Sequence, residues 1–180
     1  MNRPSTPVAV GDEPHCHQDP QTSCSSCRMS QICLPIALEA PDVERLDSII
    51  QRGRPLRRGE QVFRQNDPFH ALYAVRSGTL KSYSVSNTGA EQITAFYFPG
   101  EILGMEGISQ RVHPNTVEAL ETAAICEIPF ELLGDLSIRI PSLQRHFFQL
   151  MSQEIAEDQL LIVMLSKNSA DQRVAALLLS

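Results

Sequence analysis

The chain has 180 residues, a formal net charge of −6 and a hydrophobic content of 42%. This length is enough for one hydrophobic core with a further element, whereas the acidic balance argues against DNA binding through a basic face of the chain's own. The sequence has neither the roughly 18-residue apolar run of a membrane span nor a signal peptide. We therefore expect a cytoplasmic protein, in which the 5 cysteines are reduced thiols rather than disulfides.

The predicted elements begin after a tail, residues 1–23, that is rich in Pro, Ser, Thr and Gln and that we expect to be disordered. A cysteine-containing arm, residues 24–38, then leads into a short helix over residues 41–51. A dense group of basic residues comes next and is interpreted as a solvated entry loop: Arg52, Arg54, Arg57 and Arg58.

The cysteines form the most informative pattern in the chain. Two serines separate Cys24 from Cys27, Cys33 follows after five residues, and Cys126 stands alone much later. Thiolates at such short spacing are good soft ligands for an iron–sulfur cluster, zinc or copper(I). A distant fourth ligand would tie the arm to a folded domain, so assembling or losing the metal site would change the tertiary structure. Cys16, which two histidines flank in the tail, is interpreted as a spare thiol.

The residue pattern of the sequence changes between residues 51 and 129. Short β-prone runs alternate there with Gly, Asn, Asp and Pro turns, a pattern typical of a β-barrel or jelly-roll sandwich. We predict strands at residues 61–64, 71–76, 79–84, 92–98, 102–103, 116–119 and 123–128.

Two helices are predicted after the β region, a short one over residues 130–136 and a long one from Pro141 to about Lys167. The long helix would be about 40 Å in length, more than one small barrel needs as a cover. Its apolar residues recur at the a and d spacing of a coiled coil, which favours a dimer helix. These seam residues are Phe148, Met151, Ile155, Ile162 and Leu165.

Asp158 stands in this seam where an apolar residue belongs. Two such carboxylates facing each other across a twofold axis would repel, and their burial would be costly. We interpret Asp158 as a residue that keeps dimerisation conditional; the alternative is that it lies at the solvated edge of the seam. A further helix is predicted to begin at Ser169 and to be incomplete at Ser180.

Together these features resemble the CRP/FNR family of bacterial transcription regulators, and in particular its oxygen-responsive FNR type. The four cysteines match the cluster ligands of that type in kind, spacing and order, and the resemblance covers nearly all of residues 24–180. Further stretches that are similar to FNR are residues 74–83, 91–94, 119–122, 126–130 and 165–167.

The resemblance implies an α+β fold, in which a double-stranded β-helix (jelly-roll, cupin-like, of the cyclic-nucleotide-binding type) is followed by a long dimerisation helix. The helix-turn-helix domain of the family is missing, so the chain is interpreted as a sensor and dimerisation part. The expected division is a tail at 1–23, a cluster-binding arm at 24–38, a β-roll sensor domain at 39–136, a dimerisation helix at 137–168 and the start of a DNA-binding region at 169–180.

The resemblance also implies a [4Fe–4S] cluster, assembled without oxygen and converted by oxygen to [2Fe–2S]. The intact cluster would favour a homodimer that binds palindromic DNA, and its loss would leave monomers. Asp158 aligns with an acidic residue that opposes dimerisation, and Ile155 with the neighbour that shields it. The implied cluster ligands are Cys24, Cys27, Cys33 and Cys126, and a patch similar to an RNA polymerase contact comprises Arg76, Ser77, Asn87 and Gly89.

Other functions fit the residues less well. Structural zinc sites usually have two close pairs of Cys or His, whereas this chain has one trio and a lone partner, and a thiol–disulfide switch at Cys24 and Cys27 lacks a thioredoxin-like βαβ unit. A cyclic-nucleotide site needs an Arg to pair with the phosphate, and residues 113–116 contain none. We predict no enzyme activity, because no nucleophile–base pair or phosphate loop is present.

Overall fold

The computed structural model of the chain describes residues 22–86 and 88–167, with side chains described as far as residue 163. Several sequence predictions fall outside the described residues. These are the disorder expected for residues 1–21, the interpretations of Cys16 and Asn87, the side chain of Leu165, and the helix predicted from Ser169.

The cysteine arm folds into three short 3-10 turns and continues into the first α-helix. Prolines stand in the first turn of both η3 and α1, where the missing N–H of proline costs nothing because that donor has no partner within the helix. The helix ends two residues before the predicted position, because Gln51 and Arg52 pair with a later strand. The elements are η1 (Cys24–Ser26), η2 (Arg28–Gln31), η3 (Leu34–Ala37) and α1 (Ala40–Ile49).

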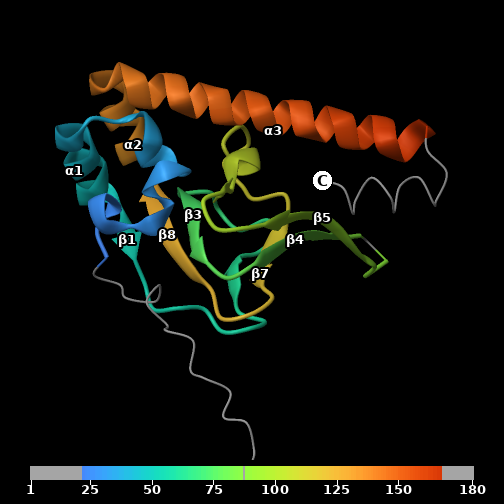
Figure 1. The fold of residues 1–180 in the computed structure, drawn as a ribbon. Coiled ribbons are helices and arrows are strands. Elements are labelled where there is room, and N and C mark those ends of the chain that lie inside the picture. Colours follow the sequence, from blue (N-terminus) through green and yellow to red (C-terminus); the bar gives the residue numbers. More distant parts are fainter. Residues whose placement is uncertain (1–21, 87, 168–180) are drawn as a thin grey trace, which may run out of the picture.

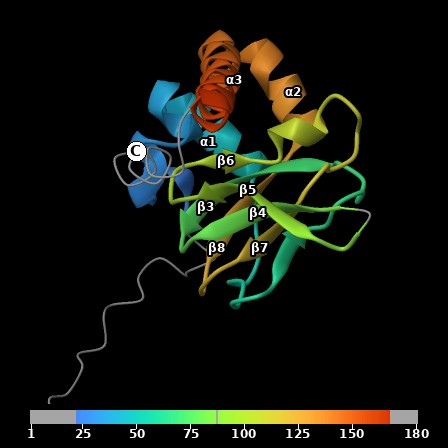
Figure 2. The same cartoon turned by 90° about the vertical axis from the view of Figure 1, so that its right-hand side faces the viewer.

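The β region forms two antiparallel four-stranded sheets, in the orders β1-β8-β3-β6 and β2-β7-β4-β5. Figures 1 and 2 show the two sheets packed face to face as a roll, with the helices gathered on one side of it. The predicted jelly-roll fold with a long C-terminal helix is confirmed. The strands are β1 (Gln51–Arg52), β2 (Gln61–Phe63), β3 (Ala71–Ser77), β4 (Leu80–Val85), β5 (Glu91–Tyr97), β6 (Ile102–Leu103), β7 (Thr116–Ala119) and β8 (Ala124–Pro129).

Two groups of buried apolar side chains stabilise this architecture. One lies inside the roll and includes Phe63, Leu80 and Val117. The other lies between the roll and the helices, and it joins Leu34 of the arm to Leu143 of the last helix. Because side chains alternate across each strand, one strand can serve both groups. The arm is therefore part of a folded core rather than an appendage.

Two helices complete the described chain, α2 (Phe130–Arg139) and α3 (Pro141–Lys167). α2 runs three residues further than predicted, and α3 has the predicted bounds. Figure 1 shows α3 crossing over the roll from α2 toward the β4–β5 hairpin. Within the described ranges, none of the helices combines the length and the apolar character that a membrane crossing requires.

Gly78, in the turn between β3 and β4, has a left-handed φ of +78°, and a Cβ at this position would lie 2.6 Å from the carbonyl oxygen of Thr122. We expect Gly78→Ala to destabilise the chain by roughly 3 kcal/mol or more, since conformational strain and steric overlap add. Gly59→Ala is the matched control, because Gly59 has a φ of +83° with nothing within 4 Å. Urea unfolding followed by circular dichroism measures both, and equal losses of stability would contradict the steric argument.

Candidate metal centre

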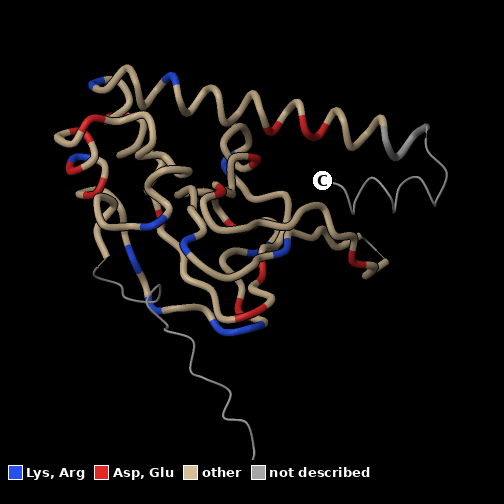
Figure 3. Tube along the Cα trace, viewed as in Figure 1, with Lys and Arg blue, Asp and Glu red and all other residues tan. Residues whose placement is uncertain are grey.

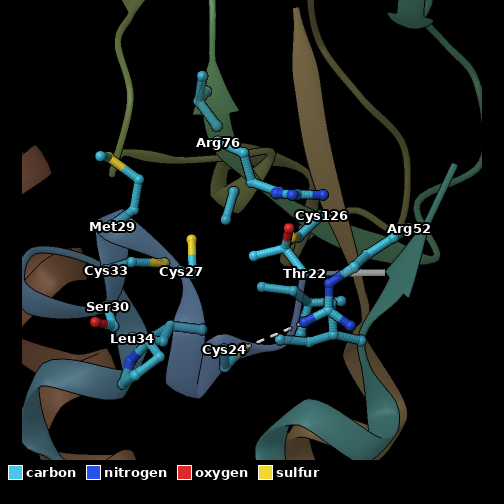
Figure 4. Close-up of a pocket in the computed structure, with 15 residues that line it drawn as sticks. Thr22, Cys24, Cys27, Met29, Ser30, Cys33, Leu34, Arg52, Arg76 and Cys126 are labelled. Atoms are coloured by element: carbon cyan, nitrogen blue, oxygen red, sulfur yellow. Dashed lines mark hydrogen bonds between the residues drawn. The ribbon is translucent and has the colours of Figure 1, made fainter. Parts of the chain in front are cut away.

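The four cysteines of the predicted site line one cavity. Cys24, Cys27 and Cys33 border it from the arm, and Cys126 borders it from β8. Figure 4 shows these side chains around the same space. All four are free thiols, and the cavity that they line is partly open to solvent. The fold thus brings the lone cysteine to the trio, as the metal-site prediction requires.

Cys126 owes its position to the sheet. β8 lies between β1 and β3, and Cys126 is directly opposite Arg52 on one side and Ala74 on the other. Residues that are opposite each other in antiparallel strands project from the same face. The side chains of Arg52 and Cys126 therefore lie next to each other, and Cys126 is only 7% exposed.

The arm presents its thiols through local backbone hydrogen bonds. The N–H of Ser30 donates to the carbonyl of Cys27 at 3.1 Å, and the N–H of Cys33 donates to Met29 at 2.8 Å. One further contact leaves the arm: the N–H of Cys24 donates to Oδ1 of Asp47 on α1 at 2.7 Å. The first cysteine is therefore tied to α1, while the other two depend on the turns.

Burial controls the protonation of these thiols. It raises the pKa of Cys24, with a further contribution from Asp47, and it raises the pKa of Cys33 to about 12. Burial also raises the pKa of Cys126, although the positive charges of Arg52 and Arg76 oppose that change. These three groups are therefore neutral thiols at pH 7. Metal binding would have to release their protons, because the thiolate is the ligand.

The thiols share a cavity without meeting at one point. In the part of the chain that the structure describes, no three His, Cys, Asp or Glu side chains are grouped closely enough to hold one metal ion. Zinc would need all four sulfurs at about 2.3 Å from a single centre. A four-iron cluster takes its four cysteines one per iron, so its ligands are spread around a larger body. The two kinds of site therefore place different demands on the spacing of the four sulfurs.

Arg52 lines the thiol cavity, although the sequence analysis did not assign it to the site. Arg54, Arg57 and Arg58 are exposed, as the entry-loop interpretation requires, but the side chain of Arg52 is only 11% exposed and lines the thiol cavity. Its Nη2 donates to Sγ of Cys24 at 3.4 Å and also to Oδ1 of Asp47. The interpretation was wrong for this residue, because pairing between β1 and β8 turns it inward. Composition gave no signal of that pairing.

The residues proposed to contact RNA polymerase lie in different environments. Arg76 is 6% exposed and lines the thiol cavity, so little of it is available to a partner protein. Ser77 is half-buried, and Gly89 is exposed in the β4–β5 turn. A polymerase contact therefore stays a prediction, for which the turn is the accessible part.

The apolar seam predicted on α3 is largely on the surface of this chain. Phe148, Ile155 and Ile162 are 59%, 57% and 64% exposed. Met151 is half-buried and Asp158 is exposed. Large apolar side chains that recur at seven-residue spacing and face solvent are typical of a helix that pairs with another helix.

The sequence is similar to curated transcription regulators along most of its length. It is 47% identical over 161 residues to "Transcriptional activator protein anr" of Pseudomonas aeruginosa, which covers 89% of this chain and 66% of that protein. It is 42% identical over 176 residues to "Electron transport regulator A" of Shewanella oneidensis, which covers 98% of this chain and 67% of that protein. The chain belongs to the CRP/FNR family. It spans about two thirds of the length of these relatives.

Two further comparisons agree with membership of the CRP/FNR family. The family described as "Cyclic nucleotide-binding domain" matches residues 53–138. The catabolite activator protein of Thermus thermophilus superposes with a TM-score of 0.64 at 26% identity, over 74% of this chain and 62% of that chain. The sensor domain of the regulator DNR from Pseudomonas aeruginosa shares the fold, with a TM-score of 0.63 at 19% identity over 73% of this chain and 89% of that one.

A second cavity lies between the roll and α3, and it is more open to solvent than the thiol cavity. Figure 3 shows acidic positions midway along α3, above the roll. Clustered carboxylates would repel the phosphate of a cyclic nucleotide. This repulsion is a second reason to expect that a cyclic nucleotide would not bind here. The acidic residues lining the cavity are Glu101, Glu154, Glu157 and Asp158.

Glu154 makes the stability of the folded chain depend on pH. Burial, followed by the charges of nearby carboxylates on α3 and on the roll (Glu106, Asp158, Glu157 and Glu101), raises the pKa of Glu154 from its ordinary value of 4.5 to about 7. A raised pKa means that the folded state favours the protonated acid. The contribution of Glu154 to the free energy of unfolding is therefore complete below about pH 4.5 and is lost as the pH rises through about 7.

We expect Glu154→Gln to raise the unfolding temperature of the metal-free chain at about pH 8 and to change it little at about pH 4, because glutamine mimics the protonated acid at both values. Scanning calorimetry at the two pH values provides the measurement. The exposed Glu44 supplies the control Glu44→Gln, which should behave like the unaltered chain. A stabilisation by Glu154→Gln that does not depend on pH would contradict the assignment.

Proposed function

We propose that this chain is the sensor and dimerisation part of an oxygen-responsive transcription regulator, an anaerobic activator, whose signal is a [4Fe–4S] cluster on Cys24, Cys27, Cys33 and Cys126. The observation that carries the proposal is the single cavity lined by four free thiols, three from the arm and one from β8. The regulators named among its relatives support it further, since "Transcriptional activator protein anr" is 47% identical.

The residues present suit such a cluster. The cavity provides four soft ligands, and the buried Nε–H of Arg52 has no hydrogen-bond partner in the described structure. A sulfur-rich anion beside this donor would satisfy it. When bound, the cluster would supply an oxygen-labile link between the arm and β8. The residues of the chain would hold the four thiolates and shield them from bulk water.

The arm offers a physical route from the thiols to α3. Leu34 follows Cys33 directly and packs in the same buried core as Leu143 of α3. Ile32, on the other side of Cys33, lines the cavity beneath α3 together with Asp158. A shift of Cys33 would therefore also move Ile32 and Leu34, its two neighbours in the chain, which lie near α3. Packed cores pass on such shifts because they are dense and have few voids.

A second copy of this chain is the occupant that we propose for the seam of α3. Phe148, Ile155 and Ile162 offer exposed apolar area at regular spacing, and each such side chain contributes about 1.5–3 kcal/mol when it is fully buried. The exposed Asp158 lies between them and would face its own symmetry mate. The repulsion between these carboxylates opposes the apolar gain, so dimerisation would respond to changes in the position of α3.

The remaining parts of the proposal concern the whole regulator. DNA would be bound by a helix-turn-helix domain outside these 180 residues, RNA polymerase would be contacted through the β4–β5 turn, and the protein would act in the cytoplasm without catalytic turnover. The homodimer would form with the cluster intact, and monomers would remain after oxygen has converted it to a [2Fe–2S] form.

Chain prepared without oxygen should be brown and contain iron and acid-labile sulfide. We expect Cys126→Ser, and a serine at any of the other three ligand positions, to remove most of both, because one iron of the cluster would lose its only protein ligand. Cys16→Ser is the control and should retain the cluster. Iron, zinc and sulfide assays decide the outcome: zinc without sulfide would exclude the cluster, and full iron content in Cys126→Ser would exclude the ligand assignment.

Asp158→Ala should dimerise in air, whereas the unaltered chain should be monomeric. Removing two facing carboxylates should tighten the dimer by about tenfold or more, equivalent to about 1.4 kcal/mol. Sedimentation velocity over a concentration series measures the dimer affinity. Glu157→Ala removes a neighbouring exposed charge of α3 outside the seam and should have a much smaller effect. Sedimentation of Asp158→Ala as an unchanged monomer would rule out the seam.

A further inference from the structure

Arg52 reaches two of the four thiols. It donates to Sγ of Cys24 at 3.4 Å, and it is directly opposite Cys126 in the pairing of β1 with β8. These two cysteines come from different parts of the fold, one from the arm and one from β8. A single guanidinium therefore bridges the two halves of the site, and its buried Nε–H still lacks a partner among the described residues.

Asp47 fixes the orientation of this guanidinium. Its Oδ1 accepts hydrogen bonds from Nη2 of Arg52 and from the N–H of Cys24. Asp47 forms an ion pair with Arg52. The pair joins α1, β1 and the first cysteine of the arm.

Arg76 approaches the cavity from the other side. β3 and β8 pair as Val75 with Ile125 and Ser77 with Ala124, so Arg76 is an extra residue in a β-bulge. Bulges redirect a side chain next to functional sites, and Arg76 is buried at the cavity. Figure 4 shows the two guanidiniums on either side of Cys126.

Four thiolates in a buried site carry a large negative charge, and burying uncompensated charge is costly. Hydrogen bonds to the sulfurs and nearby charge also tune the reduction potential of an iron–sulfur cluster. The described thiol cavity has two arginines in its lining and no carboxylate. Its composition therefore suits a polyanionic guest better than a neutral or cationic one.

We propose that Arg52, held by Asp47, is a positioning residue for the cluster: it donates N–H groups to the sulfurs of Cys24 and Cys126 and, together with Arg76, offsets the negative charge of the four thiolates. The consequence is slower loss of the cluster and a higher reduction potential than four cysteines alone would give. This inference rests on the proposed cluster.

The test compares Arg52→Gln with Arg54→Gln in the full 180-residue chain prepared without oxygen. Arg54 is a matched control, because its side chain is 69% exposed and pairs with Glu60 at the surface. Iron release to a chelator measures retention, and a potentiometric titration measures the reduction potential. We expect Arg52→Gln to lose iron about 10- to 100-fold faster, the usual effect of losing a residue that supports metal ligands. Its potential should become more negative, and Arg54→Gln should match the unaltered chain.

Two further variants separate charge from orientation. Arg52→Lys keeps the charge but not the forked donor, so its potential should stay closer to that of the unaltered chain while iron release remains faster. Asp47→Asn leaves Arg52 charged but removes its ionic partner, so retention should fall more than the potential does. Thermal unfolding of the metal-free protein reveals whether Arg52→Gln folds. If it does not fold, these two variants still test the role of Arg52.

The outcomes distinguish this inference from the proposed function. If the unaltered chain contains no iron and no sulfide, the cluster proposal fails and the inference fails with it. If the unaltered chain holds a cluster and the Arg52 variants match Arg54→Gln in both retention and potential, only the role of Arg52 is refuted. A loss of thermal stability in the metal-free Arg52 variants with unchanged potential would assign Arg52 a purely structural role and would also refute it.

Discussion

The pairing of β1 with β8 determines how the cysteine arm relates to the rest of the fold. Only Gln51 and Arg52 form β1, yet their register sets Arg52 opposite Cys126. From there the guanidinium reaches Cys24 of the arm and Asp47 of α1. The same few atoms therefore connect the arm, α1 and β8, and the shape of the thiol cavity depends on them. A slip by one residue would turn Arg52 to the opposite face and leave Asp47 without its partner.

In the described part of the chain, the thiol cavity lies on the outside of a β-roll that many proteins share. The matched cyclic-nucleotide-binding family covers residues 53–138, but the cavity between the roll and α3 is lined by carboxylates. The thiol cavity lies instead where the arm packs on the sheet β1-β8-β3-β6. Function in such folds depends on the site rather than on the architecture. Here the arm, which lies outside the matched family region, supplies three of the four thiols.

Helix α3 has two different sides. One borders the acidic cavity, where burial and neighbouring charges make Glu154 favour protonation, and the other exposes Phe148, Ile155 and Ile162. Its N-terminal part is fixed in the core through Leu143, next to Leu34 of the arm. A helix that packs against the arm at one end and carries clustered carboxylates along its middle would be sensitive to changes at the arm, as the proposed function requires.

The β-roll and the bounds of α3 could be predicted from the sequence, because strand alternation and helix periodicity are local patterns. Grouping Cys126 with the trio rested on cysteine chemistry and on the resemblance to the FNR type, because Cys126 is far from the trio in the chain and reaches the cavity through the pairing of β8 with β1 and β3. The sequence interpretation placed Arg52 in a solvated loop and Arg76 in a patch similar to a polymerase contact, whereas both line the cavity, and these two positions depend on the tertiary structure. A two-residue strand and a bulge exist because of their pairing with β8, and no pattern within the few neighbouring residues records which distant strand they will meet.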